Sequence, residues 1–315
     1  MEALPPNSLF SVFEERDKDP SRILVELDKG LRSSSIGEQC ESILFFTKLL
    51  SLYPFPSIIT TAFLKLADLY HGTSNNVIRY CIGRVFEEQA RYNTQLLQIE
   101  QKEDQSTKDM LLQRLLQPLH SSDPCAKALT LRTLGSMSSV LYDDLGMQHS
   151  IRNCLSSNNP LEASAAIFAV DGVCKRSPIF AKSILPYITE LIQGLRCTPR
   201  TKLKLIYVLR HMIHNSEMVQ EARSILQHII EILPSQIFVL VSLHTLSLLT
   251  TASLLYVSEQ VKLLLCYLDD PRRSVQLRVL RDLKQIVLQT SYQIESSIWP
   301  IEKLIELNQL SKYSE

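Results

Sequence analysis

Apolar residues recur along this chain at the three- to four-residue spacing of helices that bury one face. Stretches such as ESILFFTKLL, ALTLRTLGSM and AKSILPYITELIQGL carry the pattern, and short polar breaks separate them. The pattern predicts a chain built mostly of amphipathic helices.

A proline recurs at the start of these patterns about every 37 residues, at Pro124, Pro160, Pro199, Pro234 and Pro271. Proline suits the first position of a helix, because the N–H that it lacks would find no partner there. A residue whose side chain can cap the helix precedes four of the five prolines: Asp123, Asn159, Thr198 and Asp270. The exception is Leu233. We therefore expect a helix to begin at each proline.

The positions after the proline predict which face of each helix is packed. Seven residues on, the chain has Leu131, Ile167, Ile206 and Val241; in the last repeat Val279 continues the apolar stripe in place of Arg278. A second helical pattern lies between successive prolines, so each repeat is predicted to be a pair of antiparallel helices. One pair cannot bury both of its faces, and stacking of pairs buries them.

Upstream, Gly37 and Asn75 begin similar helices 38 residues apart, which brings the predicted total to about seven pairs. The charged run at 100–109 is an apparent insertion, expected to form a loop or the solvated start of a helix. Tetratricopeptide and ankyrin signatures are absent, so the expected fold is an all-α, HEAT/armadillo-like α-solenoid. We expect a single solenoid over 21–311, a flexible amino terminus over 1–20 and a tail over 312–315.

Composition narrows the possible functions. Only 8 of the 315 residues are glycine, which argues against sites built on glycine-rich phosphate loops. Basic and acidic residues balance at 33 each, so no net electrostatic field favours binding to nucleic acid or membrane.

The seven cysteines are scattered and never form a CxxC pair, which is typical of a protein in a reducing compartment. We expect them to be small buried residues. The amino terminus has no secretory signal pattern.

One apolar stretch, 232–258, contains no charged residue and is long enough to span a membrane. Several hydroxyl side chains, His244 and Pro234 interrupt it, and no cluster of Lys or Arg flanks it. We therefore expect the buried central helix of a helical stack, with a membrane span as the lesser alternative.

Patterns that carry chemistry are few. The chain has no GxSxG, GxxxxGK[ST] or HExxH motif. His211 and His214 lie three residues apart on a predicted helix, but a zinc site needs further ligands that no spacing identifies. We expect a solvated or partner-facing histidine pair, and we predict no catalytic, cofactor-binding or metal-ligating residue.

Basic residues gather on two of the proline-started helices. They are Arg200, Lys202 and Lys204 on one, and Arg272, Arg273, Arg278 and Arg281 on another two repeats later. Corresponding helices of a stack line up, so these residues form a candidate basic stripe for phosphate or an acidic partner. The alternative is an ordinary solvated face balanced by Asp and Glu on neighbouring helices.

Several segments resemble a known family in their particular residues, and not only in the spacing of the repeat. In order they include LVELDKGLRSSSIGEQCES, YPFPSIITTAFLKLADLY, LHSSDPCAKALTLRTLGSM, TKLKLIYVLRHMIH and YLDDPRRSV. Together they resemble the amino-terminal region of the Integrator complex subunit 7 family, collinearly over about 24–283. Members of that family continue well beyond the solenoid portion, whereas this chain ends at SKYSE, so contacts made by their carboxy-terminal part are not carried over.

The resemblance implies a nuclear, non-enzymatic scaffold, with a cytoplasmic pool left open. Its partners would be other Integrator subunits and, indirectly, RNA polymerase II and nascent RNA, with no small-molecule substrate, cofactor or membrane. The implied roles are 3′-end processing of small nuclear RNA, attenuation of transcription and a link with the DNA-damage response. A generic HEAT-repeat adaptor in transport or trafficking is the alternative that the period alone allows.

Overall fold

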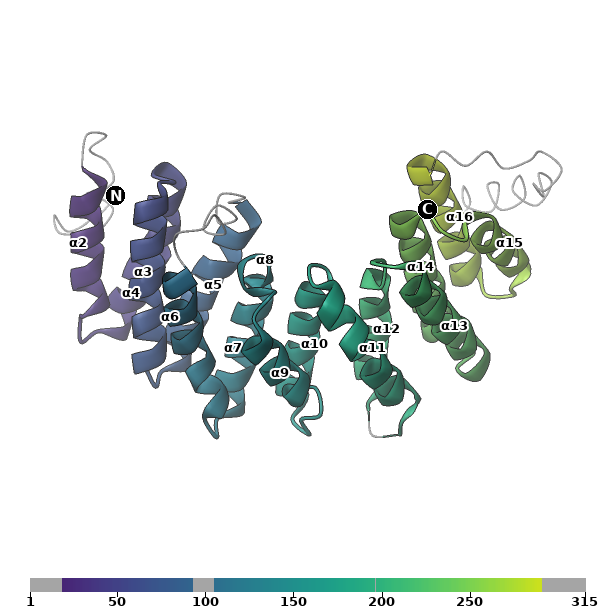
Figure 1. The fold of residues 1–315 in the computed structure, drawn as a ribbon, viewed down its shortest axis with the longest axis horizontal. Coiled ribbons are helices and arrows are strands. Elements are labelled where there is room, and N and C mark those ends of the chain that lie inside the picture. The colour runs from purple at the N-terminus through teal and green to yellow at the C-terminus, as the bar shows by residue number, and fades with distance from the viewer. Residues whose placement is uncertain (1–18, 93–104, 196, 291–315) are drawn as a thin grey trace, which may run out of the picture. The chain divides into compact units, whose positions relative to one another are not determined.

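The computed structural model describes residues 19–92, 105–195 and 197–290, and within these ranges the secondary structure is helical, without strands (Figure 1). The first helices are α2 (Pro20–Leu31), α3 (Ile36–Leu52), α4 (Pro56–Gly72), α5 (Asn76–Tyr92), α6 (Gln105–Leu116), η2 (Gln117–His120), α7 (Pro124–Ser136), α8 (Ser138–Leu141) and α9 (Leu145–Cys154). They are followed by α10 (Pro160–Cys174), α11 (Pro178–Gln193), α12 (Pro199–Val208), η3 (Leu209–His211), α13 (Ser216–Ile232), α14 (Gln236–Ser253), α15 (Val257–Cys266), η4 (Tyr267–Asp269) and α16 (Arg273–Thr290).

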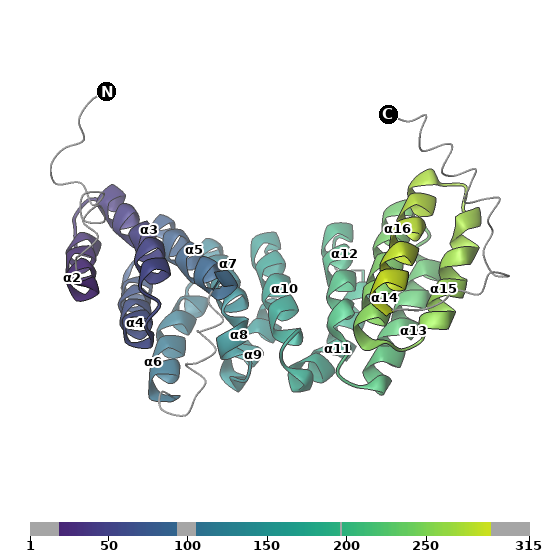
Figure 2. The same ribbon diagram turned by 90° about the horizontal axis from the view of Figure 1, so that it is seen from above.

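The helices form successive pairs: α2–α3, α4–α5, α6–α7, α9–α10, α11–α12, α13–α14 and α15–α16. The second helices of neighbouring pairs pack side by side, as α3, α5, α7 and α10 do in Figure 2. The first helices α2, α4 and α6 pack in the same order. The predicted all-α, HEAT/armadillo-like solenoid is confirmed.

Contacts divide the chain into two compact units, Met1–Lys204 and Leu205–Glu315, with the boundary inside α12. A single solenoid over 21–311 remains a prediction. Residues 1–18 of the expected flexible amino terminus, and the expected tail at 312–315, lie outside the described residues. Residues 100–104 of the expected insertion lie outside the described residues, whereas 105–109 belong to α6 and are not a loop.

The core of the first unit is formed by the packed faces of both the first and the second helices. Leu131 is fully buried and Ile167 is 4% exposed, as their position after the proline predicts. Phe86 of α5 meets Phe63 of α4 edge to face, with the ring centroids 4.9 Å apart. The same periodicity that defines the helices thus selects the residues of the core.

In the second unit, α14 packs against α13, α15 and α16. It is also the one described helix that is long and apolar enough to cross a membrane, and half of its residues are buried within the structure. Several of its hydroxyl side chains donate to its own backbone: Thr245 donates to the Val241 carbonyl and Ser247 to the Leu243 carbonyl. These bonds let hydroxyl groups lie among packed helices without the cost of an unpaired polar group.

Helix starts follow the prediction in three of the five repeats. Asp123 and Asn159 accept hydrogen bonds from the first-turn N–H groups of α7 and α10, and Thr198 accepts one from Thr201 in α12. By contrast, α14 and α16 begin two residues after their prolines, which corrects the prediction for Pro234 and Pro271. At α16 the reason is local: the Arg272 carbonyl accepts the first helical bonds, from Val275 and Gln276.

Candidate functional site

The predicted basic residues of α12 lie at the end of the first unit. Arg200 and Lys204 are exposed and Lys202 is half-buried. Lys204 donates to the hydroxyl of Ser164 in α10, and no ion pair joins any of the three to a described residue. These side chains are therefore available to an acidic group from outside the chain.

The predicted basic residues of α16 have different surroundings. Arg272 forms a bidentate ion pair with Asp270, in which Nη2 lies 2.7 Å from Oδ2 and Nε lies 2.8 Å from Oδ1. Its Nη1 donates to the Pro234 carbonyl. The hydrogen bonds from Arg272 hold the pKa of the Asp270 carboxyl below its ordinary value. Arg278 pairs with Asp282, whereas Arg273 and Arg281 are exposed. Arg272 and Arg278 thus have acidic partners within their own segment.

The two groups of basic residues belong to different units, and each is described by itself. A continuous stripe that joins Arg200, Lys202 and Lys204 to Arg272, Arg273, Arg278 and Arg281 remains a prediction.

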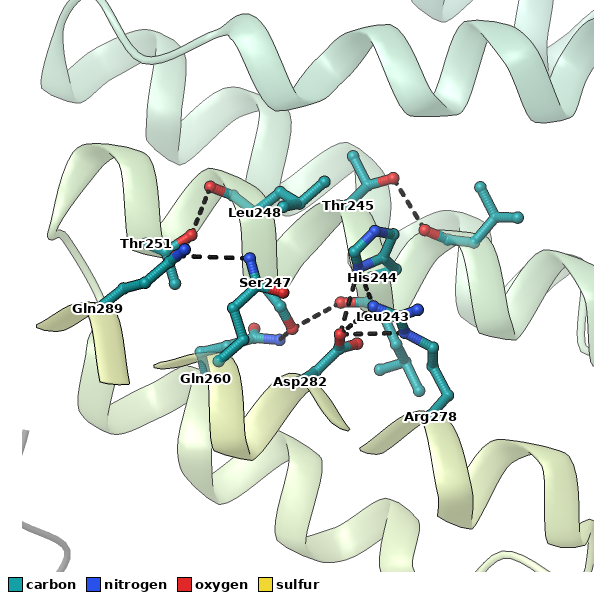
Figure 3. Close-up of polar contacts among 12 residues, drawn as sticks. Leu243, His244, Thr245, Ser247, Leu248, Thr251, Gln260, Arg278, Asp282 and Gln289 are labelled. Atoms are coloured by element: carbon teal, nitrogen blue, oxygen red, sulfur yellow. Dashed lines mark hydrogen bonds and ion pairs between the residues drawn. The ribbon is translucent and has the colours of Figure 1, made fainter. Parts of the chain in front are cut away.

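A buried carboxylate joins α14 to α16 (Figure 3). Asp282 has no exposed surface, and its Oδ1 accepts from Arg278 Nε at 3.0 Å and lies 3.2 Å from His244 Nδ1. Arg278 also contacts that histidine nitrogen, and the Tyr207 ring stacks on the imidazole with centroids 6.1 Å apart. A buried charge that loses its partner costs about 3–5 kcal/mol, so this cluster ties the two helices together.

A second polar chain links three helices of the same unit. Nearly buried Arg223 of α13 donates to Gln260 Oε1 of α15 at 3.1 Å, and Gln260 Nε2 donates to Ser247 Oγ of α14 at 3.2 Å. Burial lowers the pKa of Arg223, and Glu259, at 3.6 Å, opposes that shift. Sequence reasoning missed both clusters. A signal existed, since Gln260 and Asp282 adjoin the buried residues Val261 and Leu283.

The histidine pair does not share a helical face. α12 ends at Val208, His211 closes the short helix η3, and His214 lies in the bend before α13. Asn215 ends that bend by capping α13, where its side chain accepts from the Met218 N–H at 2.7 Å. The expectation of one helix is therefore wrong. Across 19–92, 105–195 and 197–290, no group of three or more His, Cys, Asp or Glu residues is placed to hold a metal ion.

The expectation that the cysteines are buried is also corrected. Cys174 is buried, Cys125 and Cys266 are exposed, and the other four are half-buried. Exposure follows helix position: Cys125 lies in the first turn of α7, and Cys266 is the last residue of α15. Burial, and to a lesser extent the neighbouring Cys40 thiol, raise the pKa of the Cys81 thiol to about 11.

A basic groove between α5 and α7 is the surface that sequence reasoning overlooked. Its volume is about 370 Å³, and three arginines line it, Arg79 and Arg84 from α5 and Arg132 from α7. The two helices are separated along the chain by α6, so no local motif could have revealed the groove.

The family of the chain follows from its sequence comparisons. The family model described as Integrator complex subunit 7, N-terminal, matches residues 24–315. Integrator complex subunit 7 of Gallus gallus is 41% identical over 273 residues, 86% of this chain and 27% of the relative. The Homo sapiens protein is 40% identical over 281 residues, 89% of this chain and 28% of the relative. The chain thus spans little more than a quarter of the length of these relatives.

More distant comparisons agree. The Dictyostelium discoideum homolog of Integrator complex subunit 7 is 35% identical over 303 residues, 96% of this chain and 28% of the relative. Among solved structures, an engineered protein matches with a TM-score of 0.50 at 15% identity, covering 85% of this chain and 70% of that protein. The structural match concerns the fold alone, whereas the sequence matches establish the family. The chain belongs to the Integrator complex subunit 7 family and corresponds to its amino-terminal region.

Proposed function

We propose that this chain is a non-catalytic scaffold subunit of the Integrator complex. The observation that carries the proposal is the family match over residues 24–315, which includes most of α2 and all of the described helices after it. Stacked helix pairs present a long surface built from short-range contacts, which suits a protein that holds several partners.

The partners proposed for this scaffold are other Integrator subunits, with RNA polymerase II and nascent RNA engaged indirectly. In that assembly it supports 3′-end processing of small nuclear RNA and attenuation of nascent transcripts, and it takes part in the DNA-damage response. Its site of action is the nucleus. The proposal is supported by the family match and concerns the amino-terminal region, because the relatives are several times longer than this chain.

Affinity purification of the tagged chain from nuclear extract tests this function. We expect other Integrator subunits among the recovered proteins. The matched control is the tagged Leu131→Asp variant, which places a charge at a fully buried position, should unfold the helices around α7 and should weaken this recovery. Recovery of no Integrator subunit by the folded parent chain would overturn the proposal. Imaging that places the chain on cytoplasmic membranes would instead support a trafficking adaptor.

A depletion and rescue experiment tests the finer role. Cells depleted of the endogenous protein should accumulate small nuclear RNA precursors with uncleaved 3′ ends, measured by RNA blotting. Re-expression of the protein should restore cleavage. Unchanged precursor levels after effective depletion would contradict a role in this processing step.

A further inference from the structure

The basic groove is formed by the close approach of α5 and α7. Gly83 faces Thr133, and a Cβ atom at Gly83 would lie 2.8 Å from the Thr133 hydroxyl oxygen. The glycine therefore leaves the space that a larger side chain would fill. The complete lining is Arg79, Tyr80, Gly83, Arg84, Glu87, Leu129, Arg132, Thr133 and Ser136. A volume of about 370 Å³ is large enough to hold side chains of a bound peptide.

The groove carries an excess of positive charge. Three arginines line it against one acid, Glu87, which pairs with Arg84 at 3.0 Å. Arg79 is nine-tenths buried and donates to the Asn76 side chain and the Thr73 carbonyl. Asp123, which does not line the groove, interacts with Arg79, and positive charge still exceeds negative. Arg132 is exposed and forms no ion pair with any residue in the described ranges.

An aromatic ring holds this unpaired guanidinium in place. The Arg132 Cζ lies 5.2 Å from the centroid of the Phe168 ring, which belongs to α10 and is 38% exposed. Such a cation–π contact orders the guanidinium, so that less freedom is lost when a carboxylate binds it. On the other helix, Tyr80 is 54% exposed beside Arg84. Arginine and aromatic residues together are typical of the energetic centre of protein interfaces.

We propose that the groove between α5 and α7 binds an acidic peptide segment of a partner protein. A carboxylate of that segment pairs with Arg132 and shares Arg84 with Glu87, and an adjoining apolar side chain packs on Phe168 or Tyr80.

A nucleic acid is the less suitable occupant. A phosphate backbone repeats its charge every few ångströms and is bound by an extended basic track. Here the arginines are confined to the two helices α5 and α7. Glu87 lies among them, and the exposed rings of Tyr80 and Phe168 flank them. A short segment that mixes carboxylates with apolar side chains matches this arrangement of charge and apolar surface.

Selection of random dodecapeptides against the purified full chain tests the proposal without other subunits. We expect enrichment of peptides that combine Asp or Glu with Leu, Phe or Tyr. A fluorescein-labelled enriched peptide should bind the parent chain, and Arg132→Glu should weaken it at least about tenfold, the loss expected for one charge-assisted contact. Binding should also weaken with rising salt.

Arg152→Glu is the matched control, because Arg152 lies 5.5 Å from the Tyr187 ring in the same kind of contact away from the groove. It should bind the peptide like the parent. Thermal unfolding should be nearly unchanged in Arg132→Glu, since the side chain is exposed.

Three outcomes would overturn the proposal: no acidic enrichment, equal loss in both variants, or tighter binding of a single-stranded RNA oligonucleotide that Arg132→Glu abolishes. The last would assign the groove to nucleic acid. None of them bears on whether the chain recovers Integrator subunits from nuclear extract, so the two proposals fail independently.

Discussion

Asp123 connects two consecutive second helices. Its Oδ1 accepts from the Cys125 N–H at 2.8 Å and caps α7, while its Oδ2 accepts from Asn76 Nδ2 of α5 at 2.6 Å. The hydrogen bond from Asn76 is the main cause that holds the pKa of this carboxyl below its ordinary value of 3.8. A residue expected only to start a helix therefore also ties two repeats together.

Replacing Asp123 by Ala should lower the free energy of unfolding by about 1 kcal/mol, as loss of a helix cap commonly does. Because the folded pKa is depressed, the carboxylate stabilises fully above its ordinary value of 3.8, and this contribution is lost as pH falls through the folded pKa. The difference between parent and variant in denaturant unfolding should therefore be largest near neutral pH and shrink below about pH 4.

Asp123→Asn is the matched control. Its side-chain oxygen still accepts from the Cys125 N–H and does not titrate, so its stability should lie closer to the parent and should depend less on this acidic range. An Asp123→Ala variant whose deficit stays constant from pH 7 to pH 3 would contradict the proposed role of the charge.

The role of a polar residue could be predicted from the sequence only where its hydrogen-bond partner is a close neighbour along the chain. The caps at Asp123, Asn159 and Thr198 involve neighbours in sequence, so the polar residue before proline revealed them. The partners of buried Asp282 and Arg223 lie on other helices, and no sequence spacing identifies them. The prediction that Cys125 is buried was wrong, because residue type alone says little about which side of a helix is packed.

At the scale of helices, α7 and α10 approach unusually closely through small residues. A Cβ atom on Gly172 would lie 2.7 Å from the Gly135 carbonyl oxygen, and one on Gly135 would lie 2.8 Å from the Ala169 Cα. Both obstacles are backbone atoms, which cannot swing aside. Gly172 lies in the last turn of α10 and allows this contact.

We therefore expect Gly172→Ala to destabilise the protein by about 1–3 kcal/mol, the usual range for overpacking, despite the better helix propensity of alanine. The control is Gly72→Ala at the end of α4, where a Cβ meets nothing within 4 Å and φ is not positive. That change should be neutral or stabilise by a few tenths of a kcal/mol. Equal melting temperatures for the two variants would show that α7 and α10 separate at little cost.

Element boundaries were predictable where the capping residue directly precedes the helix, as at α7, α10 and α12. They shifted by two residues at α14 and α16, where the first intrahelical bonds are accepted after the proline, by Ser235 and Arg272. Proline permits a helix start but does not compel one at its own position.

At the scale of the whole molecule, the chain forms two compact units of stacked pairs. In such arrays each repeat is stabilised by its neighbours, so local damage spreads only a short distance. A substitution in α10 should therefore affect α7 and α9 and leave α14 and α16 nearly unchanged.

Ile167→Asp tests this independence, since the side chain is 4% exposed and a buried charge costs several kcal/mol. Hydrogen exchange followed by mass spectrometry should show faster exchange in α7, α9 and α10, with parent-like protection in α14 and α16. Leu161→Asp is the control on the same helix: Leu161 is exposed, and an acid in the first turn is favourable. Loss of protection throughout the chain would instead indicate one cooperative unit.

Local periodicity was enough to predict the helices, their pairing into about seven repeats, the solenoid fold and the buried faces at Leu131 and Ile167. The family resemblance was also visible in the sequence. The folded chain was needed to show that Arg84 and Arg132 line one groove, that Phe168 packs on Arg132, and how Asp282 and Gln260 find their partners. These contacts join residues from separate helices, and their geometry depends on how closely those helices pack.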